Sequence, residues 1–491
     1  MNTSTAQPES TGLERYAHLF LWVVALIAIC LVPLKIIGQG FLPIDDALRH
    51  AAKAASGKSW NDVVVLADWV KVDHNPGWHL ILRIVHATGC DVDTLVAFSV
   101  FCTFAAFAAV PLIWLRRPEI WIATLLMGCT LSDALLNRLT LGRPLVIAMT
   151  CVVALLLVWK DESEEGSIPW SRLVQSAVII AIASWVHGAW YLFCLPAVAC
   201  ALSGRWRDAG WLAATWIVGS LAGAMLTGHP VDFLVQAVAI LWHAVLEKPL
   251  SATSSSLEIL PSNGDKLICV AAGIIYVWRI SRGATSGEVV RNPAFILTLI
   301  GWIVGLKAGR FWTEWGLSAF LGWSAIQLQA SAKTMLPRVG DRCLVCLFAS
   351  AALVASTTSD LNFRWSHNLY ASDDLGGKED PQVSEWLPGP GGILYNTGMT
   401  QFYRFFFKYP GGNWRYVLGF EPTLMTPENL AVYENILKAP ESPESYKEWV
   451  HKMRANDRLM VVSAEPVPIK ELEWHLLGKR TWIGRLRTAK P

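Results

Sequence analysis

The chain has 491 residues, of which 53% are hydrophobic and only 16% are charged, and its mean hydropathy is +0.38. Soluble proteins usually carry about a quarter charged residues, so this composition excludes an ordinary soluble enzyme and indicates a polytopic membrane protein surrounded by lipid. The net charge of +2 indicates no nucleic-acid partner. The ten cysteines all lie at or before Cys346, mostly inside apolar runs, which is typical of small buried side chains rather than of disulfides or metal ligands.

Apolar runs along the chain predict its membrane spans, because a helix needs roughly 20 mainly apolar residues to cross a bilayer. About eleven such runs follow one another within residues 1–357. They cover residues 17–37, 93–115, 119–136, 143–159, 173–187, 189–203, 209–227, 266–280, 293–309, 313–331 and 342–357. The first run is long enough to span the membrane rather than to be cleaved as a signal peptide.

Lys and Arg residues in the short loops predict the orientation, because cytoplasmic loops carry an excess of them. With the N-terminus in the cytoplasm, every short inside loop is basic, beginning with Arg116 and Arg117. Residues 38–92, 228–265 and 358–491 then lie outside. We expect a multi-pass protein of a bacterial inner membrane whose C-terminal segment is periplasmic.

The C-terminal segment, residues 358–491, differs from the rest of the chain. It is polar and has no cysteine, its GILYNTG and RLMVVSAE stretches alternate like strands, and GPGG and YPGGNW mark turns. We therefore expect an all-α membrane domain over residues 1–357, followed by a small extracytoplasmic α/β domain over residues 358–491. Its aromatic segment 397–422 is suited to stacking on sugar rings, or forms an aromatic face of a small core.

Charged residues collect at the outer ends of the predicted spans and in the first outer loop, residues 38–92. Such residues are costly near lipid, and most that persist line a site. Carboxylates mixed with several fixed cations predict a site for an anionic ligand beside a general base. The candidates are Asp45, Asp46, Arg49, His50, Asp73, His74, Asp133, Arg138, Arg143, His187, Lys307 and Arg310, with Glu314 near the last of them.

Several of these residues also have purely structural explanations. Arg138 or Arg143 could be a helix-end charge that reaches the lipid headgroups. Glu314 could simply pair with Arg310, one helical turn away. His187 could be a hydrogen-bonded histidine of the core.

The adjacent acidic residues Asp45 and Asp46 need a separate explanation. Asp45 could be a helix N-cap, and His50 could pair locally with Asp46. Neighbouring residues on a helix point about 100° apart, so the two carboxylates should have different tasks. One could act as a base while the other holds a cation or an arginine.

Two segments of the first outer loop resemble the GT-C membrane glycosyltransferases. DDALRHAAKAASGKSW, residues 45–60, is similar to the acidic pair, Ala-rich turn and Ser-Gly-aromatic break of the aminoarabinose and protein O-mannosyl transferase branch. DHNPGWHLILRIVH, residues 73–86, is similar to that branch's Pro-Pro-Leu motif, with Asn75 and Gly77 in place of the first Pro and the Leu. The motifs cover about the first 150 residues, and beyond them the likeness rests on topology.

The resemblance implies a sugar transfer from a polyprenyl-phosphate donor to a hydroxyl of a glycan, lipid or protein. Asp45 then matches the catalytic base, and Asp46 matches the acid that supports the site or binds a metal in some branches. Asp133 stands where many members have a further acidic residue. A carboxylate would take the acceptor proton, and arginine would hold the leaving phosphate, in an inverting displacement. No nucleotide-sugar site is needed, and a divalent cation could bind Asp45, Asp46 or Asp133.

Three other functions remain open from the sequence. A transporter or flippase of an anionic lipid or solute would place polar groups near the midplane of the membrane, whereas these charges gather at one face. An enzyme like the O-antigen ligases would place its key residues in a large late loop, whereas this chain has them early. A scaffold without activity would tolerate replacement of Asp45 and Asp46.

Overall fold

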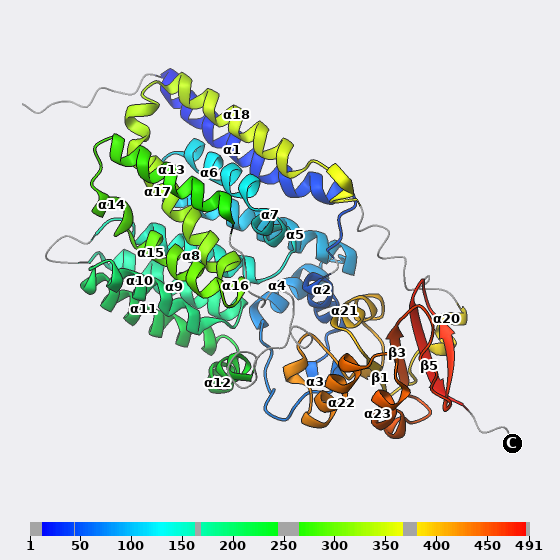
Figure 1. Ribbon diagram of the computed structural model, residues 1–491. Helices are drawn as coiled ribbons and strands as arrows, with labels where there is room; N and C mark the ends of the chain where they lie inside the picture. The colour runs from blue at the N-terminus through cyan, green and yellow to red at the C-terminus, as the bar shows by residue number, and fades with distance from the viewer. Residues whose placement is uncertain (1–11, 44, 163–167, 244–264, 367–380, 488–491) are drawn as a thin grey trace, which may run out of the picture.

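The computed structural model describes residues 12–43, 45–162, 168–243, 265–366 and 381–487. Most of these residues are helical, and a small sheet follows near the C-terminus (Figure 1). Residues 244–264 of the predicted outer segment 228–265, with Lys248 and the stretch SATSSS, lie outside the described residues. The structure therefore has the expected order, a helical part followed by a segment with strands.

The helical part is built from apolar helices of very different lengths. They are α1 (Gly12–Gly38), α5 (Val92–Ala109), α6 (Pro118–Leu131), α7 (Asp133–Thr140), α8 (Leu145–Val158), α9 (Trp170–Val186), α10 (Leu195–Leu202), α11 (Trp206–Met225), α12 (Pro230–Leu241), α13 (Lys266–Ser281), α14 (Ser286–Val290), α15 (Pro293–Gly305), α16 (Gly309–Phe311), α17 (Leu317–Met335) and α18 (Val339–Thr357). Helices α1, α6 and α18 pack side by side, as do α9 and α11 (Figure 1).

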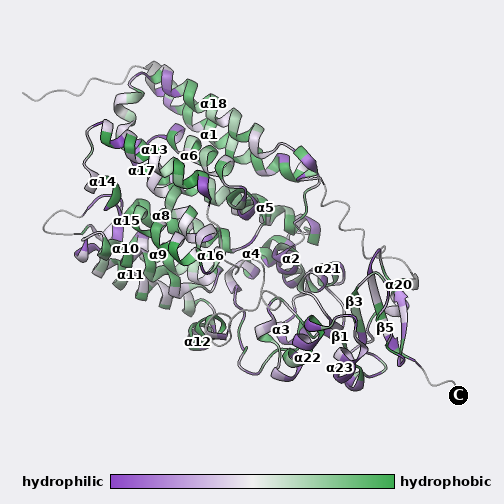
Figure 2. Cartoon of the chain, in the orientation of Figure 1, coloured by the Kyte–Doolittle hydropathy of each residue, from purple (hydrophilic) through white to green (hydrophobic). Residues whose placement is uncertain are grey.

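Three of the described helices are long and apolar enough to cross a membrane, and up to five spans result if each bent pair counts as one. One bent pair is α6 with α7, at 108°, and the other is α11 with α12, at 111°. Hydrophobic residues dominate the helical part (Figure 2), and large apolar side chains such as Ile217 and Phe348 face outward. The chain is thus a multi-pass membrane protein, whereas the predicted number of about eleven spans is not confirmed.

The predicted span at 119–136 is wrong in one respect, since it is not a single helix. Helix α6 ends before Ser132, and Ser132 caps α7 by accepting a hydrogen bond from the backbone N–H of Leu135. The hydroxyl of Ser132 also donates to Asp265 over 2.6 Å. Averaged hydropathy says nothing about the direction in which a helix runs, so the sequence could not reveal the sharp turn between α6 and α7.

Three short helices form the first outer loop: α2 (Asp46–Ser56), α3 (Trp60–Val63) and α4 (Pro76–Ala87). Asp45 caps α2, and its side chain accepts a hydrogen bond from the backbone N–H of Asp46 over 2.7 Å. Gly57 ends α2 in the left-handed region, at φ 64°, which glycine adopts without strain. The capping function predicted for Asp45 is therefore confirmed.

The C-terminal segment contains a five-stranded mixed sheet in the order β2-β1-β3-β5-β4. The strands are β1 (Gly392–Asn396), β2 (Trp414–Tyr416), β3 (Arg458–Val462), β4 (Leu472–Leu476) and β5 (Thr481–Leu486), and the helices are α20 (Pro381–Trp386), α21 (Met399–Lys408), α22 (Pro427–Lys438) and α23 (Lys447–Lys452). Strand β1 runs parallel to β2 and β3, whereas β5 is antiparallel to β3 and β4. Both stretches predicted as strands, GILYN and RLMVV, form strands.

The first outer loop lies between the apolar helices and the sheet (Figure 1). Helix α2 packs against α4, α5 and α21, so it joins both parts of the chain. The backbone N–H of Val65 donates to the carbonyl of Tyr416 over 2.8 Å, which attaches the loop to the edge strand β2. This arrangement brings the first outer loop and the C-terminal segment together.

Candidate functional site

A cavity of about 500 Å³ lies where α2 meets the ends of several apolar helices and the C-terminal segment. The predicted residues that line it are Asp45, Asp46, Arg49, His50, His74, Arg143, His187 and Arg310. Further lining residues are Asn75, Tyr191, Glu314, Met399, Thr400, Tyr403, Phe420 and Glu421. The volume falls within the range of small-molecule sites.

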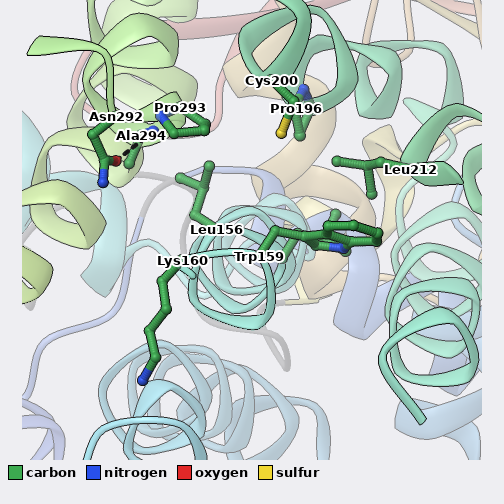
Figure 3. A pocket seen from close by; sticks show the side chains of 10 residues that line it. Leu156, Trp159, Lys160, Pro196, Cys200, Leu212, Asn292, Pro293 and Ala294 are labelled. Carbon is green, nitrogen blue, oxygen red and sulfur yellow. Dashed lines mark hydrogen bonds between the residues drawn. The ribbon is translucent and has the colours of Figure 1, made fainter. Parts of the chain in front are cut away.

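A second void lies between α8, α10, α11 and α15 (Figure 3). Trp159, Lys160 and Cys200 are among its lining residues. Its volume is about 10 Å³, which holds one water molecule at most. It is a packing defect between helices, so the larger cavity is the candidate site.

The two aspartates of the cavity each face a guanidinium group. Arg143 donates a hydrogen bond from Nη2 to Asp45 Oδ2, and its Nε lies 3.8 Å from Asp46 Oδ2. Arg49 Nε donates to Asp46 Oδ1 over 2.7 Å. Both arginines come from elements that end in the cavity, Arg49 from α2 and Arg143 from the turn before α8. The acidic pair is therefore matched by two fixed positive charges.

The two carboxyl groups differ in basicity because their surroundings differ. Burial raises the pKa of Asp45 above its ordinary value, although Arg143 opposes this shift. Burial also acts to raise the pKa of Asp46, but Arg49 and Arg143 together hold that pKa well below its ordinary value. Asp45 is thus the better proton acceptor of the pair, and Asp46 stays ionised as a partner of the arginines.

Asp73 does not line the cavity but is hydrogen-bonded to a buried histidine beside it. Its Oδ2 lies 2.5 Å from His79 Nδ1, and its Oδ1 accepts from the backbone N–H of Asn75 over 3.0 Å. The other ring nitrogen of His79, Nε2, lies 2.8 Å from His50 Nδ1. His79 was not singled out in the sequence, since nothing in the motif around α4 distinguishes it from a core histidine.

His74 and His187 form one wall of the cavity. Their ring centroids lie 5.9 Å apart in an edge-to-face arrangement. The backbone N–H of Gly188 donates to the carbonyl of His74 over 3.1 Å, so the end of α9 is tied to the loop before α4. Both residues line the cavity.

Arg310, in α16, and Glu314, in the π-helical turn Trp312–Gly316 before α17, lie together. Arg310 Nε donates to Glu314 Oε1 over 2.7 Å, so the pairing considered from the sequence is present. Arg138 Nη2 approaches the same oxygen to 3.8 Å, from behind the cavity. Arg310 is the more accessible arginine of the two, with 34% of its side chain exposed.

Four predicted residues do not line the cavity, namely Asp73, Arg138, Asp133 and Lys307. Asp133 is the first residue of α7, and its side chain is 87% exposed, with Arg364 at 3.4 Å. The bend between α6 and α7 turns it away from the acidic pair. Lys307 is exposed, and it does not line the cavity although its neighbour Ala308 does.

The described residues do not provide a cage for the divalent cation that the sequence left open. No group of three His, Cys, Asp or Glu side chains in the described part of the chain is placed to hold a metal ion. Asp45 and Asp46 point at guanidinium groups, whereas Asp133 lies elsewhere. The donor set therefore does not fit a divalent cation.

The C-terminal segment supplies one wall of the cavity. The guanidinium carbon of Arg49 lies 4.3 Å from the ring centroid of Phe420. The hydroxyl of Tyr403 donates to the carbonyl of Phe420 over 3.5 Å, and its pKa is raised well above the ordinary value by burial and by the charge of Asp46. The sequence predicts either a sugar-stacking surface or an aromatic core face for segment 397–422, but no pattern links it to residues so early in the chain.

A scan against family models and a search of curated protein sequences find no match. Solved structures are similar. ArnT from Cupriavidus metallidurans bound to undecaprenyl phosphate matches with a TM-score of 0.57 and 12% identity, over 97% of this chain and 98% of that chain. Two Archaeoglobus fulgidus structures match over 92% of this chain and 70% of theirs: the apo oligosaccharyltransferase (TM-score 0.51, 11% identity) and AglB in complex with an inhibitory peptide and a dolichol-phosphate (TM-score 0.52, 9% identity). At such identities the likeness shows the fold alone.

Proposed function

We propose that this chain, which has the fold of the GT-C membrane glycosyltransferases, moves a sugar from a polyprenyl-phosphate carrier to an acceptor hydroxyl. The observation that carries the proposal is the cavity, in which a half-buried acidic pair faces two arginines beside the ends of apolar helices. Two similar structures, of ArnT and AglB, contain polyprenyl phosphates. A donor carried on a lipid suits a cavity that lies beside the ends of apolar helices.

In the proposed reaction Asp45 is the general base. It takes the proton of the acceptor hydroxyl while that oxygen bonds to the anomeric carbon, and the bond from this carbon to the phosphate oxygen breaks. The phosphate leaves with the electron pair, so the configuration is inverted. Burial favours the proton-accepting task of Asp45, since it raises the pKa of this carboxyl group.

Arginines around the acidic pair are proposed to bind the leaving phosphate. Arg143 and Arg310 line the cavity, and a guanidinium group can hold two phosphate oxygens at once. Asp46 keeps Arg49 and Arg143 oriented before the donor arrives. Asp133 has no role in the proposed reaction, and no step depends on a metal.

The acceptor is proposed to bind against the wall formed by Tyr403, Phe420 and Glu421, which come from the C-terminal segment. Aromatic faces suit sugar rings, and acceptor hydroxyls suit a carboxylate. We place this segment on the periplasmic side of a bacterial inner membrane, with the N-terminus in the cytoplasm, because the short loops that would then be inside are basic.

Asp45→Asn tests this function. Purified wild type and variant are offered a panel of radiolabelled polyprenyl-phosphate sugars with a membrane extract as acceptor source, and sugar leaving the carrier is followed. Loss of the base should lower the rate by roughly 10²- to 10⁴-fold. Asp133→Asn is the matched control and should keep the wild-type rate, since that side chain is exposed.

Unchanged turnover in a folded Asp45→Asn protein would refute the assignment of the base. Absence of transfer and of hydrolysis with the whole panel would favour the transporter or flippase instead. That alternative is measured directly, as movement of a labelled polyprenyl phosphate across vesicles that contain the purified protein.

A further inference from the structure

The half-buried Asp73 and two buried histidines form a continuous hydrogen-bonded chain that ends at a lining residue of the cavity. Asp73 Oδ2 lies 2.5 Å from His79 Nδ1, and His79 Nε2 lies 2.8 Å from His50 Nδ1. The three residues come from the loop before α4, from α4 and from α2. His50 is 1% exposed and lines the cavity, and its Nε2 has no hydrogen-bond partner among the described residues.

The order of donors and acceptors along this chain is fixed by Asp73. Burial acts to raise the pKa of Asp73, but His79 and the backbone N–H of Asn75 hold it well below the ordinary value, so the side chain is a carboxylate that only accepts. Its Oδ1 accepts from Trp60 Nε1 over 3.2 Å as well as from the Asn75 N–H. Oδ2 remains for His79, which must therefore carry its proton on Nδ1.

The remaining steps follow from the chemistry of neutral imidazole, which has one donor and one acceptor nitrogen. Burial lowers the pKa of both His79 and His50, so each ring carries a single proton at neutral pH. With its proton on Nδ1, His79 accepts at Nε2 a hydrogen bond from His50 Nδ1–H. The Nε2 atom of His50 is consequently a bare acceptor.

We infer that His50 Nε2 accepts a hydrogen bond from a hydroxyl group of the bound substrate, and that Asp73 and His79 act as positioning residues that fix this polarity. The inference rests on the proposed function, because it assumes a substrate rich in hydroxyl groups. A bare nitrogen matches a hydroxyl donor, whereas it would repel a phosphate oxygen. The hydroxyl belongs either to the donor sugar or to the acceptor, and both sources share this chemistry.

Asp73→Asn replaces one carboxylate oxygen by an NH₂ group and should reverse the direction of the hydrogen bonds along the chain. The amide oxygen of the new side chain still accepts from Trp60 and from the Asn75 N–H, whereas its NH₂ group faces His79 Nδ1. His79 then carries its proton on Nε2 and donates to His50 Nδ1, so the proton of His50 moves to Nε2. His50 then has a donor at Nε2 in place of an acceptor, and the shape of the group is kept.

The expected result is a KM increase of on the order of 10-fold or more, with a smaller change in kcat, because a substrate hydroxyl loses its acceptor. Donor and acceptor concentrations are varied separately, and the substrate whose KM rises owns the hydroxyl. His50→Asn, which retains an amide N–H near the position of Nδ1 but deletes Nε2, should raise the same KM. Asp62→Asn is the control, since Asp62 is exposed and only completes the capping box of α3 with Ser59.

Tautomers are read independently of turnover from ¹⁵N spectra of histidine-labelled protein. Wild type should show protonated Nδ1 in His79 and His50, and Asp73→Asn should show protonated Nε2 in both. Protonated Nε2 of His50 in wild type, or a reversed spectrum with both KM values unchanged, would overturn the inference.

Binding of polyprenyl-phosphate mannose and of polyprenyl phosphate without sugar is also measured by calorimetry. If wild type gives the predicted spectrum and Asp73→Asn selectively weakens binding of the mannose compound, but no transfer occurs, only the proposed function fails. Failure of the inference and failure of the proposed function therefore give different results.

Discussion

His74 shows how burial changes the chemistry of one side chain. Burial, together with the positive charges of Arg49 and Arg310, lowers the pKa of His74 to about 4. In the unfolded chain its pKa returns to about 6.5, so between these values the unfolded state binds a proton that the folded state does not. The free energy of unfolding therefore falls as the pH falls from 6.5 to 4, by at most about 1.4 kcal/mol per pH unit for this group.

His74→Gln tests this contribution. The melting temperature of wild type in detergent should drop between pH 7 and pH 4.5, and the variant should show a shallower drop because glutamine does not titrate. His229→Gln is the control, since His229 is exposed and its removal should leave the pH dependence as it is. An equal drop in His74→Gln and wild type would show that other groups account for the effect.

Individual site residues could be predicted where local chemistry identified them. Asp45, Asp46, Arg49 and His50 are close in sequence on one short helix, so their common location follows from the helix itself. Asp133 was equally acidic and equally near a predicted span end, yet the structure exposes it. Its direction depends on a bend that only tertiary contacts determine.

At the scale of elements, Gly77 explains how α4 approaches α9. A Cβ atom at this position would lie 2.5 Å from Trp185 Cδ2 and 2.9 Å from the Trp185 carbonyl oxygen. The similar GT-C motif has leucine at this position, and the close approach of Trp185 explains why this chain has glycine instead. The absence of a side chain lets the two helices touch, which places the His74 and His187 rings opposite each other.

Gly77→Ala should therefore destabilise the protein. The added methyl group forces α4 away from α9, at a cost of about 1–3 kcal/mol, which exceeds the gain of roughly 1 kcal/mol from the better helix propensity of alanine. Gly273→Ala, in α13, meets no atom within 4 Å and should keep or raise the melting temperature. A Gly77→Ala protein as stable as wild type would show that the helices can separate without loss.

Helices were the most predictable elements, because long apolar runs have few other ways to satisfy their backbone in lipid. The two strands named from alternation were also correct. The breaks were not predictable: α6 stops at Ser132 and α11 stops before α12, each with a bend above 100°. Such bends depend on contacts such as that between Ser132 and Asp265, which are distant in sequence.

At the scale of the whole molecule, the site is complete only because the C-terminal segment packs on the first outer loop. Lys58 donates from Nζ to the Gly412 carbonyl, and Ala67 N–H donates to the Leu424 carbonyl over 2.9 Å. These contacts join residues that no local pattern relates, which is why the wall around Phe420 could not be predicted from the sequence. The C-terminal segment thereby controls the surroundings of Arg49.

Phe420→Ala tests how strongly the C-terminal segment affects Arg49. Arg49 lies between Asp46 and the Phe420 ring, so removing the ring frees one face of the guanidinium group and admits water beside the acidic pair. A desolvated cation–π contact is worth on the order of 1–2 kcal/mol, which corresponds to roughly tenfold in transfer rate. Leu476→Ala, an exposed position on the far edge strand β4, should leave the rate unchanged. If Phe420→Ala transferred sugar as fast as wild type, the C-terminal segment would serve only to close the cavity, and the orientation of Arg49 would be set by Asp46 alone.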